Sequence, residues 1–192
     1  MTYLAAIILA GGAARRLGGV DKPLLEIRGR TILARTLDAL RCETSLIALA
    51  ANGDPARYAA YPLPVVDDGA LAGEGPLAGI LAGLEWADRQ GAEALLTVAG
   101  DMPFLPSGLA AALSPSPSFA ATGGQDHPVI ALWPVALLGT LDAWMVRSES
   151  RSVRAFAAAI GARAVDFADA SLFANVNTPE DLAEARRRAA EG

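Results

Sequence analysis

A continuous apolar run that ends in a glycine-rich, basic segment most constrains how this chain folds. Residues 3–9 read YLAAIIL, without alternation of polar and apolar side chains, and AGGAARRLGGVDK follows directly. An uninterrupted run of this length, bounded by glycines, predicts a strand buried on both faces, as in the parallel sheets of α/β proteins. The segment after it predicts a phosphate-binding loop, because glycine lets backbone N–H groups close around oxygen atoms.

Strand-like and helix-like patterns alternate along the rest of the chain. Buried strands are expected at 45–51, 63–68 and 94–100, and helices at 31–40 and 76–87. Beyond residue 113 the alternation loosens. There we expect two strands around the Gly123–Gly124 turn, one of them antiparallel, helices near 134–146 and 151–160, a strand at 162–167 and a helix over 178–190. This order predicts one α/β domain of three layers, with a mostly parallel sheet and one antiparallel strand.

The composition argues against several classes of function. A net charge of −5 disfavours broad nucleic-acid binding, which needs a basic face. No apolar run reaches the roughly 18 residues that cross a bilayer, so no membrane partner is expected. The single cysteine, Cys42, cannot form an internal disulfide, which favours a cytoplasmic location.

The glycine-rich segment contains the only lysine of the chain. Lys22 is one of 16 basic residues, all the others being arginine, and Arg15 and Arg16 lie close to it. Such a cluster in an acidic protein suits a triphosphate or pyrophosphate, and a mobile ammonium can follow charge on a reacting phosphoryl group. The alternative is a surface loop with solvated charges. The segment is not a P-loop, since Pro23 follows Lys22, and it lacks the G-x-G-x-x-G dinucleotide fingerprint.

Carboxylates lie where two of the strands are expected to end. Asp101 follows the strand at 94–100, the place where open α/β sheets bind ligands. It is a candidate ligand for Mg²⁺ bridging phosphates, the alternative being an Asx turn or a helix cap. Asp67 and Asp68 end the strand at 63–68, where one of them could meet a ribose hydroxyl or a base edge, or either could simply begin a polar loop.

Three further features are candidates for contact with a second substrate. GEGPLAG (73–79) leads into a helix and could receive an anionic group or be a flexible loop. Asn175 and Asn177 precede Thr178, the expected N-cap of the last helix, and exceed what capping needs. His127 is the only histidine. A structural or substrate-contacting role is favoured for it over metal ligation, because no second His or Cys completes a cluster.

These motifs together resemble the molybdenum cofactor guanylyltransferases, the enzymes that make molybdopterin guanine dinucleotide. The opening LAGGAARRLGGVDKPLLEIRGRTIL is similar to the signature of that family. The segments VVDD, GPLAG, GDMPFLP, DHPVIAL, VDF and NVNTPEDL recur in its order and spacing, so the resemblance covers essentially the whole chain. It implies a Rossmann-like nucleotidyltransferase fold over 1–192, with the nucleotide bound by about 1–101 and the pterin substrate by a closing part of about 102–192.

The resemblance also implies an activity. GMP would pass from Mg-GTP to the terminal phosphate of molybdopterin, or of molybdenum-loaded molybdopterin, with release of pyrophosphate. The LAGG form of the loop favours GTP over other nucleotides.

The resemblance assigns roles residue by residue. It implies catalytic roles for Lys22, Arg16 and Asp101, and nucleotide contacts for Leu9, Ala10, Gly11, Gly12, Lys22, Asn52, Asp68 and Asp101. Substrate contacts fall to Gly75, Gly79, Asn175 and Asn177. The implied metal is Mg²⁺, for which Mn²⁺ can substitute, held by Asp101 and Asn177.

One position departs from the family pattern. The family usually has NANR after the second strand of the sheet, with its first asparagine near the guanine, whereas this chain has AANG. Ala50 takes that position and Asn52 follows two residues later, so guanine selection there is expected to be weaker or to move to Asn52.

The resemblance also implies further partners, and two alternative functions remain open. Other cofactor-biosynthesis proteins and chaperones of target molybdoenzymes are expected partners besides GTP and the pterin. One alternative is another nucleotidyltransferase, which transfers CMP to molybdopterin or a nucleotide to a sugar or lactyl phosphate; nucleotide preference separates it. The other is a non-catalytic nucleotide-binding protein, against which Lys22 and Asp101 stand.

Overall fold

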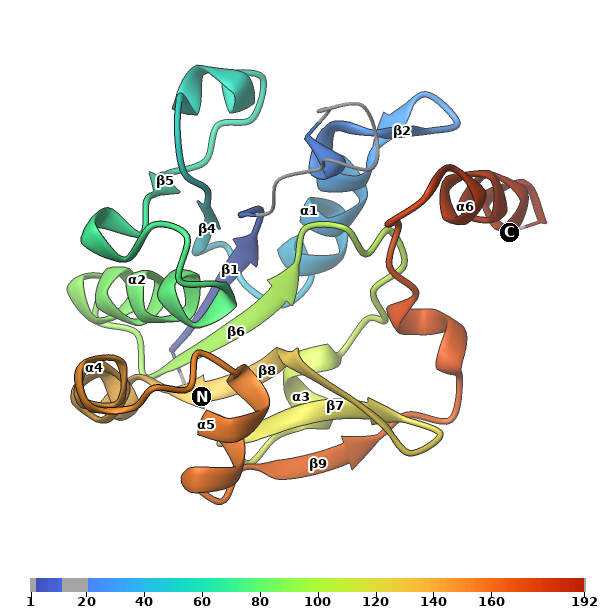
Figure 1. The fold of residues 1–192 in the computed structure, drawn as a ribbon. Coiled ribbons are helices and arrows are strands. Elements are labelled where there is room, and N and C mark those ends of the chain that lie inside the picture. Colours follow the sequence, from blue (N-terminus) through green and yellow to red (C-terminus); the bar gives the residue numbers. More distant parts are fainter. Residues whose placement is uncertain (1–2, 12–20, 192) are drawn as a thin grey trace.

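Seven strands form one mixed sheet through the middle of the molecule (Figure 1). The computed structural model describes residues 3–11 and 21–191. The strands are β1 (Leu4–Leu9), β4 (Ile47–Ala50), β5 (Val65–Val66), β6 (Ala94–Ala99), β7 (Ser118–Thr122), β8 (Gln125–Pro134) and β9 (Arg163–Asp166). Their order in the sheet is β5-β4-β1-β6-β8-β7-β9, and only β8 runs antiparallel to its neighbours among these strands. The expected sheet, mostly parallel with one antiparallel strand, is confirmed.

Helices cover both faces of the sheet, which makes three layers. Helices α2 (Pro76–Arg89), α4 (Leu138–Arg147) and α5 (Val153–Ala159) pack on one face, and α1 (Ile32–Arg41) and α3 (Leu109–Leu113) on the other. Successive residues of β1 serve the two cores in turn: Ile7 packs in the first and Ile8 in the second, both fully buried. In the part of the chain that is described, no helix has the length and apolarity to cross a membrane.

Two helices, α1 and the last helix of the chain, begin where the capping residues of the sequence indicate. The Thr31 side chain accepts a hydrogen bond from the backbone N–H of Ala34 at 3.0 Å and starts α1. At α6 (Pro179–Glu191) the Thr178 hydroxyl accepts from the N–H of Asp181 at 3.1 Å, while the Asp181 carboxylate accepts from the N–H of Thr178 at 2.9 Å. Each cap satisfies N–H groups that have no partner inside the helix.

Three short elements and one boundary differ from the sequence-based expectation. Strands β2 (Glu26–Ile27) and β3 (Arg30–Thr31) form a small hairpin before α1, and α3 is a single short helix. Runs of two to five residues are too short for a periodic pattern to predict. Helix α4 begins at Leu138 and not near 134, because β8 continues to Pro134, which pairs with Ala94 of β6.

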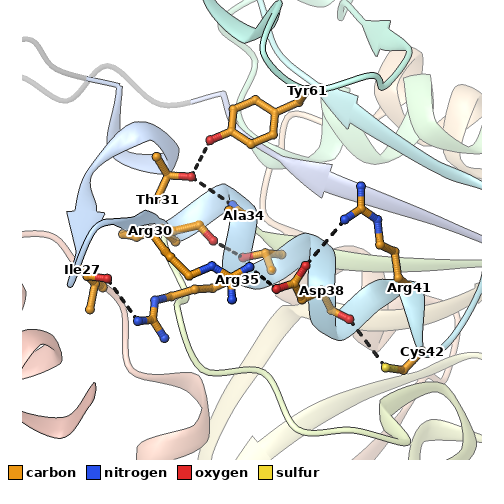
Figure 2. A network of polar contacts seen from close by, with 11 residues as sticks. Ile27, Arg30, Thr31, Ala34, Arg35, Asp38, Arg41, Cys42 and Tyr61 are labelled. Atoms are coloured by element: carbon orange, nitrogen blue, oxygen red, sulfur yellow. Dashed lines mark hydrogen bonds and ion pairs between the residues drawn. The ribbon is translucent and has the colours of Figure 1, made fainter. Parts of the chain in front are cut away.

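Polar contacts fix the hairpin to α1 and to the chain beyond it (Figure 2). The Arg35 guanidinium of α1 donates to the carbonyl of Ile27 at 3.1 Å, and Arg30 of the hairpin pairs with Asp38 of α1. The Thr31 hydroxyl, besides capping α1, bonds the hydroxyl of Tyr61. The β2–β3 hairpin is therefore held by α1 on one side and by Tyr61 on the other.

Candidate functional site

A cavity of about 380 Å³ opens at the edge of the sheet where the parallel strands end. Strand β1 is the switch point of the sheet, since the connection to β4 runs to one side of it and β6 lies on the other. Because β8 is antiparallel, its first residues come to the same edge as the last residues of β1, β4 and β6. The wall is made by Leu9, Ala10, Gly11, Lys22, Pro23, Ala50, Asp68, Gly75, Pro76, Gly79, Ala99, Gly100, Asp101, Met102, Gln125, Asp126, His127, Pro128, Val129 and Asn175.

Short backbone bonds hold the end of β1 against its neighbours at this cavity. The N–H of Ala10 donates to the carbonyl of Ala50 at 2.8 Å, and the N–H of Gly100 donates to the carbonyl of Leu9 at 2.9 Å. Helix α2 approaches closely through Gly79, where a Cβ atom would lie 3.0 Å from Leu9 Cδ2 and 3.5 Å from Asp68 Oδ1. Glycine at this position lets the first turn of α2 form one wall of the cavity.

The ammonium of Lys22 joins three distant parts of the chain. Its Nζ lies 3.2 Å from Oδ2 of Asp101 and also donates to Oδ1 of Asn177, residues that are 79 and 155 positions away in sequence. The N–H of Val176, a buried residue, donates to the carbonyl of Asp101 at 2.9 Å and so fixes this C-terminal segment to the end of β6. The Lys22 and Asp101 side chains keep 22% and 19% exposure, which leaves their charges open to a ligand.

Two side chains of the same group, Asp101 and Asn177, have the chemistry of a metal site. Oxygens of Asp101 and Asn177 both reach the single nitrogen of Lys22, so the two can converge on one cation. Among residues 3–11 and 21–191 there is no cluster of three His, Cys, Asp or Glu that could hold a metal alone. One carboxylate and one amide oxygen fit a Mg²⁺ ion that takes its remaining ligands from water and substrate phosphates, as this ion does in nucleotide sites.

Asp68 is held in place by Asn52 on the other side of β1. The Asn52 amide donates to Oδ2 of Asp68 at 2.7 Å, and its oxygen accepts from the N–H of Asp68 at 3.0 Å. The pKa of the Asp68 carboxyl lies above its ordinary value, chiefly because the group is buried. The hydrogen bond from Asn52 opposes this rise, and the charge of the neighbouring Asp67 adds to it. Asn52 is not part of the cavity wall; it orients a carboxylate that is.

The structure brings most of the residues singled out in the sequence to this one place. The cavity wall includes Leu9, Ala10, Gly11, Lys22, Asp68, Gly75, Gly79, Asp101 and Asn175. Asn52 and Asn177 are not among the lining residues, but they hydrogen-bond to Asp68 and Lys22, which are. Gly12 and Arg16 lie outside the described residues.

The segment Gln125–Val129 was not assigned to the site from the sequence, apart from the open question about His127. Nε2 of His127 lies 2.7 Å from the Thr122 hydroxyl, and the centroid of the His127 ring is 5.4 Å from that of the Phe173 ring. Burial lowers the pKa of His127, although the charge of Asp126 acts in the opposite direction. The Asp126 carboxylate pairs with Arg154 of α5. Two signals in the sequence pointed to this segment. One was the expected antiparallel strand, whose beginning must reach the edge where parallel strands end, and the other was DHPVIAL, one of the segments that carry the family resemblance.

Comparison with known proteins gives consistent similarities. The family model of the MobA-like NTP transferase domain matches residues 6–164. The molybdenum cofactor guanylyltransferase of Acidiphilium cryptum is 49% identical over 189 residues, covering 97% of this chain and 96% of that protein. The enzyme of the same name from Rhodopseudomonas palustris is 46% identical over 193 residues, covering 95% and 92%.

Among solved structures, molybdopterin-guanine dinucleotide biosynthesis protein A from Archaeoglobus fulgidus superposes with a TM-score of 0.74. The superposition covers 98% of this chain and 100% of that one at 18% identity, and so supports the fold alone.

Proposed function

This chain belongs to the MobA-like NTP transferase family, and from that premise we propose that it is a molybdenum cofactor guanylyltransferase. It transfers GMP from GTP to the terminal phosphate of molybdopterin, or of the molybdenum-loaded form, and releases pyrophosphate. The observation that carries the proposal is the contact of Lys22 with Asp101 and Asn177, the first two of which line the cavity at the switch point of the sheet. The name that its relatives bear, at 46–49% identity over nearly the whole chain, supports the choice of substrates.

We assign the two substrates to different parts of the chain. We assign the nucleotide to residues 1–101, which supply Leu9, Ala10 and Gly11 at the end of β1 and Asp68 beside Asn52. We assign the pterin substrate to residues 102–192, with Asn175 and Asn177, and to Gly75 and Gly79 at the start of α2. The strand order supports this division, because β4 and β5 lie on one side of β1 while β6 and β8 lie on the other.

The reaction needs charge stabilisation and positioning more than proton transfer. An oxygen of the acceptor phosphate forms a bond to the α-phosphorus of GTP, and the bond from that phosphorus to the oxygen of the departing pyrophosphate breaks. A phosphate dianion is already a nucleophile, so no strong base is required. Lys22, and Arg16 with it, neutralise charge on the phosphates in the transition state, which is where electrostatic stabilisation increases the rate.

A divalent cation belongs to this assignment. Asp101 and Asn177 would hold Mg²⁺, or Mn²⁺ in its place, and the ion when bound would neutralise phosphate oxygens. Because Lys22 already contacts both side chains, its ammonium is close enough to shift onto the phosphates when the nucleotide arrives. The reaction is assigned to the cytoplasm, with other cofactor-biosynthesis proteins and chaperones of molybdoenzymes as partners in delivery.

Guanine selection falls to a small set of groups. The Ala50 side chain lines the cavity but offers no hydrogen bond, so it cannot read the base. Asp68, oriented by Asn52, presents an acceptor that suits the adjacent N–H and amino donors of guanine. Backbone groups beside it complete the selection of the base.

The proposal is tested by removing the charge of Asp101 without changing its shape. Wild-type protein, GTP labelled at the α-phosphate, Mg²⁺ and molybdopterin should yield a labelled dinucleotide, and Asp101→Asn should lower kcat by about 100-fold or more. The thermal midpoint should change little, because the carboxylate is near the surface of the cavity. Wild-type protein that forms no labelled product, or an Asp101→Asn variant that turns over normally, would overturn the assignment.

A further inference from the structure

Residues 128–130 of strand β8 are not paired with either neighbouring strand. The pairing of β8 with β7 passes from Phe119 opposite Ala131 directly to Ala120 opposite His127, so residues 128–130 have no partner on β7. On the other side, the pairing with β6 ends at Thr97 opposite Ala131. A bulge of several residues bends a strand and redirects its side chains, and bulges are frequent beside active sites.

The start of β8, together with the first residues of the bulge, forms one wall of the cavity, the β8 wall. Gln125–Val129 line it from β8, whereas Asp68 and Ala50 line it from the side of β4 and β5. Asp101, at the end of β6, lies between these two sides in the order of the strands. A nucleotide whose base lies near Asp68 and whose phosphates reach Asp101 leaves the β8 wall for the second substrate.

His127 is the side chain of that wall best prepared to meet a planar ring. Nε2 is committed to the Thr122 hydroxyl and the ring rests against Phe173, so its orientation is fixed on two sides. Among residues 3–11 and 21–191 no hydrogen bond to Nδ1 is found, which leaves this nitrogen for a ligand. Pro128 follows directly and adds an apolar ring to the wall. An aromatic face with one polar atom suits a heteroaromatic bicycle, which stacks and hydrogen-bonds along its edge.

We propose that Gln125–Val129 is the acceptor-recognition wall and that His127 in it binds the planar bicyclic ring of the acceptor. The inference rests on the proposed function for the identity of the acceptor, a pterin. It assigns a side chain that determines acceptor affinity and has no part in binding GTP.

The experiment measures the two substrates separately in His127→Ala and His127→Asn. The probe for the acceptor is an oxidised, fluorescent pterin with a terminal phosphate on its side chain, titrated in the presence of Mg²⁺; GTP binding is followed calorimetrically. His127→Ala should weaken pterin binding by about tenfold and raise the KM for molybdopterin similarly, with the affinity for GTP unchanged. His127→Asn, which keeps a polar atom near Thr122, should lose less. Val146→Ala, at an exposed site on α4, is the matched control and should match wild type throughout.

The outcomes separate this inference from the function on which it rests. Unchanged pterin affinity in both His127 variants, or a loss of GTP affinity as large as the loss of pterin affinity, overturns the inference. Weaker pterin binding in His127→Ala supports it even if the wild-type protein prefers another nucleotide, in which case the guanylyl assignment fails alone. Wild-type protein that does not bind the phosphorylated pterin at all overturns both.

Discussion

Lys22 shows how a single residue can be constrained by three segments at once. Its ammonium is a compact charge, and one nitrogen atom contacts both the Asp101 carboxylate and the Asn177 amide. A guanidinium carries the same charge but spreads it over a planar fork that cannot take the same place between two oxygens. The chain uses arginine at each of its other basic positions, so the ammonium is specific to this site.

Lys22→Arg should therefore be a poor substitute. We expect kcat for GMP transfer to fall by about 100-fold while the thermal midpoint stays near that of wild type, because the charge is kept and the side chain is only partly buried. Steady-state rates with saturating GTP and molybdopterin measure the loss. Near-normal turnover would remove the explanation offered here for the single lysine.

Substitutions at two glycines of α2 can distinguish an effect on GTP binding from an effect on the stability of the fold. At Gly79 a Cβ would lie 3.0 Å from Leu9 Cδ2 and 3.5 Å from Asp68 Oδ1, both on the cavity wall. Gly79→Ala should weaken GTP binding by about tenfold, while the gain in helix propensity offsets much of the crowding and leaves stability within about 1 kcal/mol. Calorimetric titration and chemical unfolding measure the two effects.

Gly83, one turn further along α2, is the matched control. A Cβ there would lie 2.9 Å from Ile7 Cδ1 and 3.0 Å from Leu95 Cδ2, inside the core. Gly83→Ala should lower stability by about 1–3 kcal/mol through overpacking and should bind GTP like wild type wherever it is folded. Equal losses of GTP affinity in the two variants would contradict the placement of Leu9 and Asp68, against which Gly79 packs, at the nucleotide.

At the scale of elements, one arginine ties the segment bearing Lys22 to the segment that orients Asp68. The Arg57 guanidinium donates to both carboxylate oxygens of Asp21 at 2.8 Å, and also to the carbonyls of Asn52 and Asp54. Asp21 immediately precedes Lys22, and Asn52 orients Asp68. Because the contact is near the surface, it contributes little to the stability of the fold. Its effect is to position the segments that carry Lys22 and Asp68.

Arg57→Met keeps the aliphatic stem and removes these bonds. We expect the dissociation constant for GTP to rise by about fivefold to tenfold, because Lys22 and Asp68 must then be ordered by the ligand itself, with little change in the unfolding free energy. Arg89→Met, which removes an exposed pair with Glu85 at the far end of α2, is the control. An Arg57→Met variant with the GTP affinity of the control would show that the two segments are ordered independently.

The sequence predicted the elements that have a periodic pattern and missed those that depend on pairing. The stripes of α1 and α2 are buried as expected, since apolar residues at helical spacing have one arrangement against a sheet. The β2–β3 hairpin has strands of two residues, and the bulge of β8 is a matter of register between distant segments. Neither leaves a local pattern to read.

For the whole molecule, the order of the strands places the candidate site. β1 lies between β4 and β6, and β8 brings its first residues to the same edge, so side chains from positions 9 to 177 gather around one cavity. The positions of Lys22 and Asp101 could be anticipated, because residues after buried parallel strands meet at one edge. The wall from Gln125 to Val129 could not, because it depends on β8 being the neighbour of β6, which no local pattern shows.

The most direct test of guanylyl transfer is a competition among nucleotides. Wild-type protein is incubated with molybdopterin, Mg²⁺ and equal concentrations of GTP, CTP, ATP and UTP, and the dinucleotide products are identified by mass. We expect molybdopterin guanine dinucleotide in excess over each of the other products by about 100-fold, since a site built for the donors of guanine leaves polar groups unpaired with other bases. A predominance of the cytosine dinucleotide, or the absence of any dinucleotide, would contradict it.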